Sequence, residues 1–131
     1  MITTKKTAQG FTLFEIMIAV AILGGLIALF YPMITRYQKR AAISTANLTL
    51  GQIQQAINMF KTDTGQYPAS LQDLIRKPSD QKIAAKWVSE YADEKLIDKP
   101  EMEYRRTPGA KHPYELTFTI EGVDEPLSVW K

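Results

Sequence analysis

The sequence contains no cysteine and only one histidine, His112, among its 131 residues. The absence of cysteine excludes a disulfide framework and a thiolate metal site. With no cysteine and one histidine the chain has too few ligands for a typical zinc site, and a Ser-His-Asp triad is improbable. Phosphate-binding loops, G-x-S-x-G elbows and H-E-x-x-H motifs are absent as well. We therefore predict a protein that is not an enzyme and that carries no cofactor or metal.

Charge is missing from one long stretch of the chain. Residues 16–34 contain no charged side chain, although 23% of the whole sequence is charged. Nineteen residues nearly match the roughly 20 that a helix needs to cross a hydrocarbon core. A chain of this size cannot enclose a helix that is apolar all round, and a secretory signal would have a shorter apolar region followed by a small-x-small site. An uncleaved membrane anchor is the simplest remaining interpretation.

Basic residues flank both ends of this apolar run, so they do not decide its orientation. Lys5 and Lys6 precede the run, whereas Arg36, Lys39 and Arg40 follow it. A count of basic residues at the two membrane faces is therefore two against three.

Residues 9–15, QGFTLFE, do not fit a plain anchor. Glu15 places a carboxylate at the entrance of the apolar run, where ionisable groups are costly and are functional candidates. Near the interface the carboxylate can also reach water, and in the first helical turn the helix dipole favours it. Both a structural and a functional role of Glu15 stay open on these grounds.

Residues 6–32, KTAQGFTLFEIMIAVAILGGLIALFYP, resemble the class III signal of type IV pilins and of the pseudopilins of type II secretion. The resemblance implies that residues 1–10 are a leader, which a prepilin peptidase removes by cutting between Gly10 and Phe11. It further implies N-methylation of Phe11 and a role in assembly for Glu15, whose carboxylate meets the Phe11 amine of a neighbouring subunit. Phe14 departs from the pattern, in which leucine or isoleucine is more usual.

Removal of the leader would also change the charge balance. The full chain has 16 basic and 14 acidic residues, and the loss of Lys5 and Lys6 leaves 14 of each sign. A nucleic-acid partner then has no electrostatic support.

Beyond the apolar run, a second helical pattern predicts an amphipathic half-helix. Apolar residues recur every three or four positions and form one stripe: Ile43, Ala46, Leu50, Ile53, Ile57 and Phe60. Gly65 is the expected helix stop. We thus expect a continuous helix from 11 to 61, divided into an apolar half, 11–34, and an amphipathic half, 35–61.

Gly24, Gly25 and Pro32 interrupt the apolar half-helix, because proline removes a backbone donor and glycine weakens a helix. Two interpretations stay open at this point. The Gly24–Pro32 stretch is either a tolerated membrane kink or, as the resemblance implies, a segment that unwinds when subunits pack into a filament.

Residues 62–131 form the predicted globular head. Two short helices are expected, one over 70–75 capped by Ser70 and one from 79 or 80 to about 92. The period then becomes two, which predicts strands over 102–105, 114–120 and 127–130. The predicted fold class is α+β and type IV pilin-like, with a small antiparallel sheet of about three strands packed on the amphipathic half-helix.

The head resembles the major pseudopilin of type II secretion in particular. Tyr67-Pro68 follows the long helix, and Pro108-Gly109 leads into Tyr114-Glu115-Leu116. The resemblance implies a single-pass protein of the bacterial inner membrane whose periplasmic head enters a pseudopilus. The implied partners are further copies of the chain, minor pseudopilins, prepilin peptidase, the inner-membrane assembly platform and, before assembly, membrane lipid.

Calcium is the one ion that the resemblance raises. That branch has a loop near the C-terminus rich in glycine and aspartate, whereas residues 120–126 here read IEGVDEP. The segment has three carboxylates but lacks the repeated glycines, so we expect a solvated acidic turn and no metal.

Two other functions compete with secretion. One is a subunit of a surface type IV pilus for adhesion, motility or DNA uptake, although a C-terminal cysteine pair is missing. The other is a membrane-tethered binding domain that never polymerises. His112 and the acidic residues Asp93 and Glu94 are interpreted as exposed surface groups rather than as a site.

Overall fold

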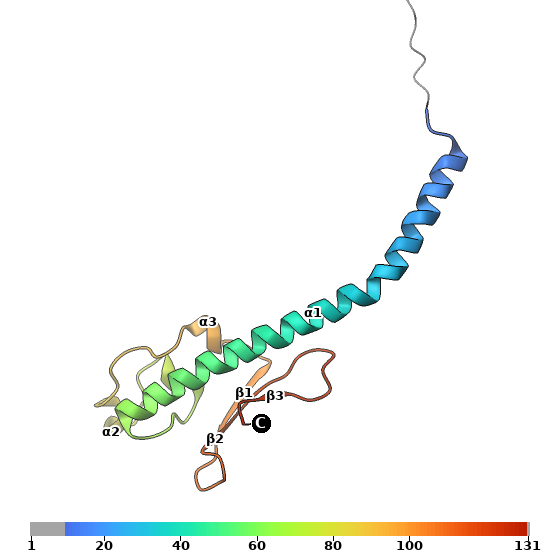
Figure 1. Ribbon diagram of the computed structural model, residues 1–131. Helices are drawn as coiled ribbons and strands as arrows, with labels where there is room; N and C mark the ends of the chain where they lie inside the picture. Colours follow the sequence, from blue (N-terminus) through green and yellow to red (C-terminus); the bar gives the residue numbers. More distant parts are fainter. Residues whose placement is uncertain (1–9, 131) are drawn as a thin grey trace, which may run out of the picture. The chain divides into compact units, whose positions relative to one another are not determined.

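The computed structural model describes residues 10–130, and the chain divides into two compact units, Met1–Gln38 and Lys39–Lys131. One helix, α1 (Leu13–Thr64), contributes to both units (Figure 1). The predicted helix over 11–61 is thus confirmed, with both of its ends two or three residues later. The predicted leader falls almost entirely on residues 1–9, which lie outside the described residues.

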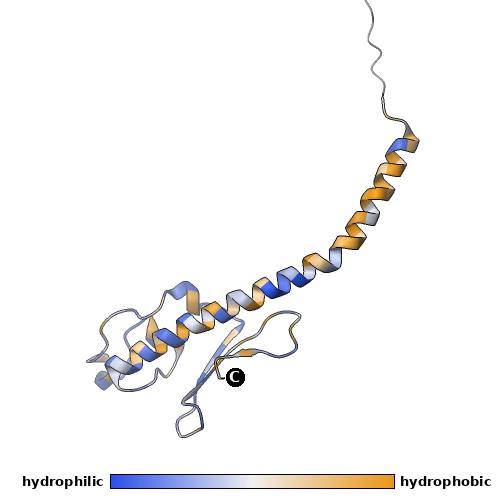
Figure 2. Ribbon diagram, in the orientation of Figure 1, coloured by the Kyte–Doolittle hydropathy of each residue, from blue (hydrophilic) through white to orange (hydrophobic). Residues whose placement is uncertain are grey.

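In the first unit, α1 is apolar and bare. Every residue from 10 to 38 is exposed to solvent, and Figure 2 shows the hydrophobic colouring of this part of the helix. By length and composition the segment is able to cross a membrane. Helix α1 continues past Gly24, Gly25 and Pro32, so none of the three ends it, although Pro32 has no N–H to donate.

Glycine ends α1 as predicted. Gly65 has a φ of 82°, which is a left-handed conformation that other residues rarely adopt. Its N–H donates to the carbonyl of Lys61 at 2.8 Å and closes the last turn. The chain can therefore leave the helix and form the rest of the second unit.

The sheet of the second unit has three antiparallel strands in the order β1-β2-β3 (Figure 1). They are β1 (Met102–Arg106), β2 (Tyr114–Phe118) and β3 (Leu127–Ser128). In the β1–β2 register Tyr104 lies opposite Leu116, so the apolar positions of both strands share the face toward α1. The α+β fold with a three-stranded sheet is confirmed. Its second and third strands are two residues shorter than predicted.

The core forms where the apolar stripe of α1 meets this face of the sheet. Ile53, Ile57 and Phe60 of α1 are completely buried, as is Leu116 of β2. Ile43, at the start of the predicted stripe, is only half-buried. Because the 67 residues after α1 cannot build an ample core alone, the helix supplies the missing apolar surface.

One predicted helix is wrong. The segment from residue 80 contains only the four-residue helix α2 (Gln81–Ala84), which Asp80 caps by accepting from the N–H of Lys82. The chain then turns, because the Trp87 indole donates to the carbonyl of Asp73 and the Tyr91 N–H donates to that of Leu74. These tertiary hydrogen bonds outweigh the local helical pattern.

Two further short helices complete the second unit. The 3₁₀ helix η1 (Leu71–Leu74) begins after Ser70, as predicted, and the Asp73 carboxylate accepts from the N–H groups of Ala69 and Ser70. Helix α3 (Glu94–Ile97) was not predicted from the sequence. Its one buried residue is Ile97, so its four residues carry too little apolar periodicity to detect.

Tyr104 makes head stability sensitive to alkali. Its hydroxyl donates to the carbonyl of Pro68 at 2.7 Å, and burial, with a smaller contribution from nearby Tyr114, raises the pKa of Tyr104. A folded-state pKa above the ordinary value of 10.0 stabilises the fold at lower pH. That stabilisation is complete below pH 10 and is lost as the pH rises above it.

We predict that the free energy of unfolding of the head falls more between pH 8 and pH 11 in the wild type than in Tyr104→Phe. The variant loses about 1 kcal/mol at pH 8 with the hydrogen bond to Pro68, but it lacks the ionising phenol. Urea unfolding of the full chain in detergent, followed by tryptophan fluorescence, measures both values. Equal losses in the two proteins would contradict the prediction.

Candidate membrane and assembly interface

The start of α1 is closed by a reciprocal pair of hydrogen bonds between Thr12 and Glu15. The Thr12 N–H donates to the Glu15 carboxylate at 3.1 Å, and the Glu15 N–H donates to the Thr12 hydroxyl oxygen at 3.2 Å. The Thr12 hydroxyl in turn donates to the same carboxylate oxygen at 3.3 Å. This arrangement is a capping box, which satisfies two backbone N–H groups that a helix start leaves without partners.

The capping box determines where the carboxylate lies. Glu15 is folded back over the first turn, so its negative charge lies at the positive end of the helix dipole. A carboxylate has about four acceptor positions, and Thr12 occupies one oxygen. The other oxygen, Oε1, forms no hydrogen bond within the described residues, so the carboxylate can accept a further donor.

Thr12 is the functional candidate that the sequence interpretation missed. The signal was present, since T-x-x-E before an apolar run is the sequence signature of a capping box. Glu15 was predicted as a site residue, but its hydrogen-bond partner three residues earlier was not.

The other predicted site residues lie as follows. Gly10 and Phe11 precede the helix and are exposed. Phe11 and Glu15 are at the same helix end, whereas Pro32 lies about five turns further along α1. Pro32 has no N–H for the carbonyl of Ala28, and the Thr35 hydroxyl donates to the carbonyl of Pro32 itself at 3.1 Å.

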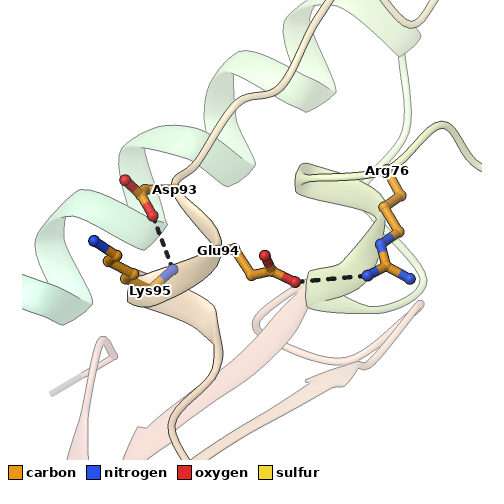
Figure 3. A network of polar contacts seen from close by, with 4 residues as sticks. All are labelled: Arg76, Asp93, Glu94 and Lys95. Carbon is orange, nitrogen blue, oxygen red and sulfur yellow. Dashed lines mark hydrogen bonds and ion pairs between the residues drawn. The ribbon is translucent and has the colours of Figure 1, made fainter.

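Asp93 and Glu94 each have a partner within the head. Figure 3 shows Asp93 accepting from the N–H of Lys95 at the start of α3, and Glu94 paired with Arg76 at 3.5 Å. Both members of the ion pair are largely exposed, so the pair adds at most about 1 kcal/mol to stability.

His112 was interpreted wrongly as a solvent-exposed turn residue. Its ring is half-buried and stacks on Trp130, with ring centroids 4.6 Å apart and an interplanar angle of 15°. The Trp130 indole donates to the carbonyl of Tyr114 at 2.7 Å, and these contacts attach the end of the chain to β2.

The segment 120–126 does not fit a calcium site. It closes a turn in which the Val123 N–H donates to the carbonyl of Ile120. Among residues 10–130, no three acidic or histidine side chains come together in a group able to hold a metal ion. The three carboxylates of the segment are therefore not gathered into one group, whereas a calcium ion takes six to eight oxygen ligands.

An apolar helix half that is bare, a capped glutamate at its start and a three-stranded sheet on its second half define a subunit of the type IV pilin-like class. Residues 5–31 match the prokaryotic N-terminal methylation motif. Residues 33–125 match the family described as type II secretion system (T2SS), protein G. The chain belongs to the type II secretion system protein G family.

Relatives agree with this assignment. The chain is 32% identical over 117 residues to the type II secretion system core protein G of Pseudomonas aeruginosa, which covers 86% of this chain and 82% of that protein. It is 31% identical over 85 residues to the core protein G of Escherichia coli K12, covering 63% and 59%. A fimbrial protein, EcpC of Eikenella corrodens, is 41% identical over 66 residues, covering 50% and 42%. No solved structure matches the chain.

We predict that Thr12→Ala loosens the first turn of α1. Loss of an N-cap hydroxyl costs about 1 kcal/mol, which corresponds to a roughly fivefold faster exchange of the Glu15 amide proton. Hydrogen exchange of the full chain in detergent micelles measures this rate, and Thr12→Ser serves as the control that keeps the hydroxyl. Unchanged exchange in Thr12→Ala would show that the capping box is not formed in the membrane-like environment.

Proposed function

We propose that the chain is a structural subunit that polymerises into the periplasmic pseudopilus of a type II secretion system and helps to drive folded proteins across the outer membrane. The observation that carries the proposal is the bare apolar half of α1 with the capped Glu15 at its start, in a chain of the protein G family. The role is structural rather than catalytic.

Processing comes first in this proposal. Prepilin peptidase cuts the exposed bond between Gly10 and Phe11 and methylates the new amine of Phe11. The leader, 1–10, is removed. The apolar half of the helix, 11–34, stays in the inner membrane as a single transmembrane span. The amphipathic half, 35–61, and the head, 62–131, are then periplasmic.

Assembly follows through the apolar half-helix. Moving this segment from lipid into a bundle of identical helices changes apolar burial little, because lipid tails are as apolar as the side chains that replace them. The register between subunits must therefore come from packing and from polar contacts. The Glu15 carboxylate supplies such a contact, because it can accept the Phe11 amine of a neighbour while the capping box holds it.

Charge pairing also explains how a carboxylate at position 15 can be tolerated in an apolar environment. A bare carboxylate and a bare amine are each costly in an apolar bundle, and pairing them offsets much of that cost. Pro32 has a separate role, since the missing hydrogen bond to Ala28 gives α1 a position where it can unwind as subunits pack. The partners in this process are other copies of the chain, minor pseudopilins and the inner-membrane assembly platform.

We predict that Glu15→Ala leaves the head folded but lowers the yield of sheared filaments at least tenfold. Glu15→Gln should assemble as poorly although it can still form the capping box, because it lacks the charge. Glu90→Ala removes an exposed carboxylate from the head and is the matched control. Filament yield from cells with the secretion machinery is the measurement, and normal yield from Glu15→Gln would contradict the charge-pair mechanism.

A further inference from the structure

Helix α1 has one short charged segment between its two ends. From residue 16 to residue 60 the charged side chains are Arg36, Lys39 and Arg40, and all three are basic. Lys39 and Arg40 follow Arg36 by three and four positions, so the three residues share one face of the helix. We call them the basic cluster. Figure 2 shows hydrophilic colouring on α1 beyond its hydrophobic first part.

The basic cluster has no acidic partner within the described part of the chain. All three side chains are exposed, and the one ion pair among residues 10–130 joins Arg76 to Glu94. The nearest carboxylates on α1, Glu15 and Asp63, are about six helical turns away on either side. Like charges at neighbouring helical positions repel one another. The fold of the single chain therefore gives no reason for the basic cluster.

The basic cluster begins where the membrane-spanning part of α1 ends. Arg36 lies about 3 Å and Arg40 about 9 Å past Ile34 along the helix axis. The headgroup layer extends about 5–8 Å beyond the hydrocarbon core on each side of a bilayer, and long basic side chains can reach along the helix toward it. Tyr31 and Tyr37 are exposed in the same region, and tyrosine is enriched at this boundary. A membrane-spanning α1 thus holds the cluster at the depth of lipid phosphates.

The proposed orientation makes three basic residues at this end of the span unusual. With the head in the periplasm, the basic cluster lies on the outer side of the inner membrane. Basic residues beside a membrane span are otherwise favoured on the cytoplasmic side. A partner of opposite charge would offset this preference, and the phosphates of the surrounding lipids are such partners. A lipid of net negative charge suits the cluster better than a zwitterionic lipid, because it does not bring a cation of its own.

We propose that the basic cluster binds the phosphate of an anionic phospholipid headgroup in the outer leaflet of the inner membrane and holds the subunit there before assembly. The inference rests on the membrane span and the orientation of the proposed function, and it adds a specific lipid chemistry. Arg36 and Arg40 each carry a planar fork of N–H donors that matches a phosphate, and Lys39 adds a third positive charge. Each basic side chain near an anionic surface strengthens the attraction about fivefold.

Native mass spectrometry of the full chain in a neutral detergent tests the proposal by counting bound lipids. Dioleoyl phosphatidylglycerol and dioleoyl phosphatidylcholine share their acyl chains and phosphate but differ in net charge. The wild type should bind phosphatidylglycerol at least about tenfold more tightly, and the Arg36→Gln, Lys39→Gln, Arg40→Gln variant should reduce this preference to less than about twofold. Equal binding of the two lipids by the wild type would overturn the proposal.

The matched control removes the same number of charges from the head. Lys82, Arg105 and Lys111 are exposed, and the Lys82→Gln, Arg105→Gln, Lys111→Gln variant should keep the full preference for phosphatidylglycerol. An equal loss in this control would show that the net charge of the chain, and not the basic cluster, attracts the lipid.

A charge-preserving variant guards against a loss of lipid binding that comes from misfolding. Arg36→Lys, Arg40→Lys keeps every positive charge, so it should bind phosphatidylglycerol within about fivefold of the wild type. If it lost as much binding as the glutamine variant, positive charge would not be the cause and the proposal would be wrong.

Two other results would assign the basic cluster to a different ligand. Millimolar inorganic phosphate should not displace the lipid, and displacement would indicate a site for soluble anions instead. A glutamine variant that binds phosphatidylglycerol like the wild type but forms no filaments would indicate that the cluster contacts a carboxylate of a neighbouring subunit. Either result would overturn the lipid proposal.

The inference and the proposed function fail separately, because lipid binding is measured without filaments. If the wild type prefers phosphatidylglycerol but forms no filaments in cells with an intact secretion machinery, the lipid site stands and the proposed function is wrong. If filaments form but the preference is absent, the proposed function stands and the lipid site is wrong.

Discussion

The rest of the structure depends on the fact that the two halves of one helix suit different environments. The first half suits an apolar environment, and the second half suits water on one side and the core of the head on the other. The first half of α1 is apolar on every side, and no other part of residues 10–130 buries it. The second half concentrates its apolar residues on one stripe, where Ile53, Ile57 and Phe60 are buried against the sheet. A helix that is apolar all round is unstable in water unless lipid or other helices cover it. This requirement is consistent with the proposed function, in which lipid covers the helix before assembly and other copies cover it afterwards.

The polar groups at the start of α1 can determine the register between neighbouring apolar helices. Burial alone does not distinguish one register of apolar helices from another, because hydrophobic contacts are non-directional. The capping box between Thr12 and Glu15 holds a carboxylate at the helix end next to the position where processing would create an amine. In the proposed assembly this intrachain interaction prepares the contact between subunits, and the helix dipole stabilises the charge of Glu15 before that contact forms.

Much of this architecture could be predicted from the sequence, because the long helix and the strands carry strong periodic signals. The apolar stripe predicted the helix, and Gly65 predicted its end. The alternation around Tyr114 and Leu116 predicted a strand of the sheet. The failures occurred where long-range hydrogen bonds override local pattern. The helix expected beyond residue 84 does not form, since the backbone carbonyls of Asp73 and Leu74 bind Trp87 and Tyr91.

The candidate site was predictable in part for similar reasons. Gly10, Phe11 and Glu15 lie in a contiguous motif that can be recognised without a fold, whereas the stacking of His112 on Trp130 joins residues that only the fold brings together.

The measurement that tests the account most directly is the intact mass and N-terminal sequence of the protein extracted from its native membrane. The account predicts a chain that begins at N-methylated Phe11, with residues 1–10 removed. A chain that keeps residues 1–10 in cells with an active prepilin peptidase would contradict it, because no amine would then exist beside Glu15.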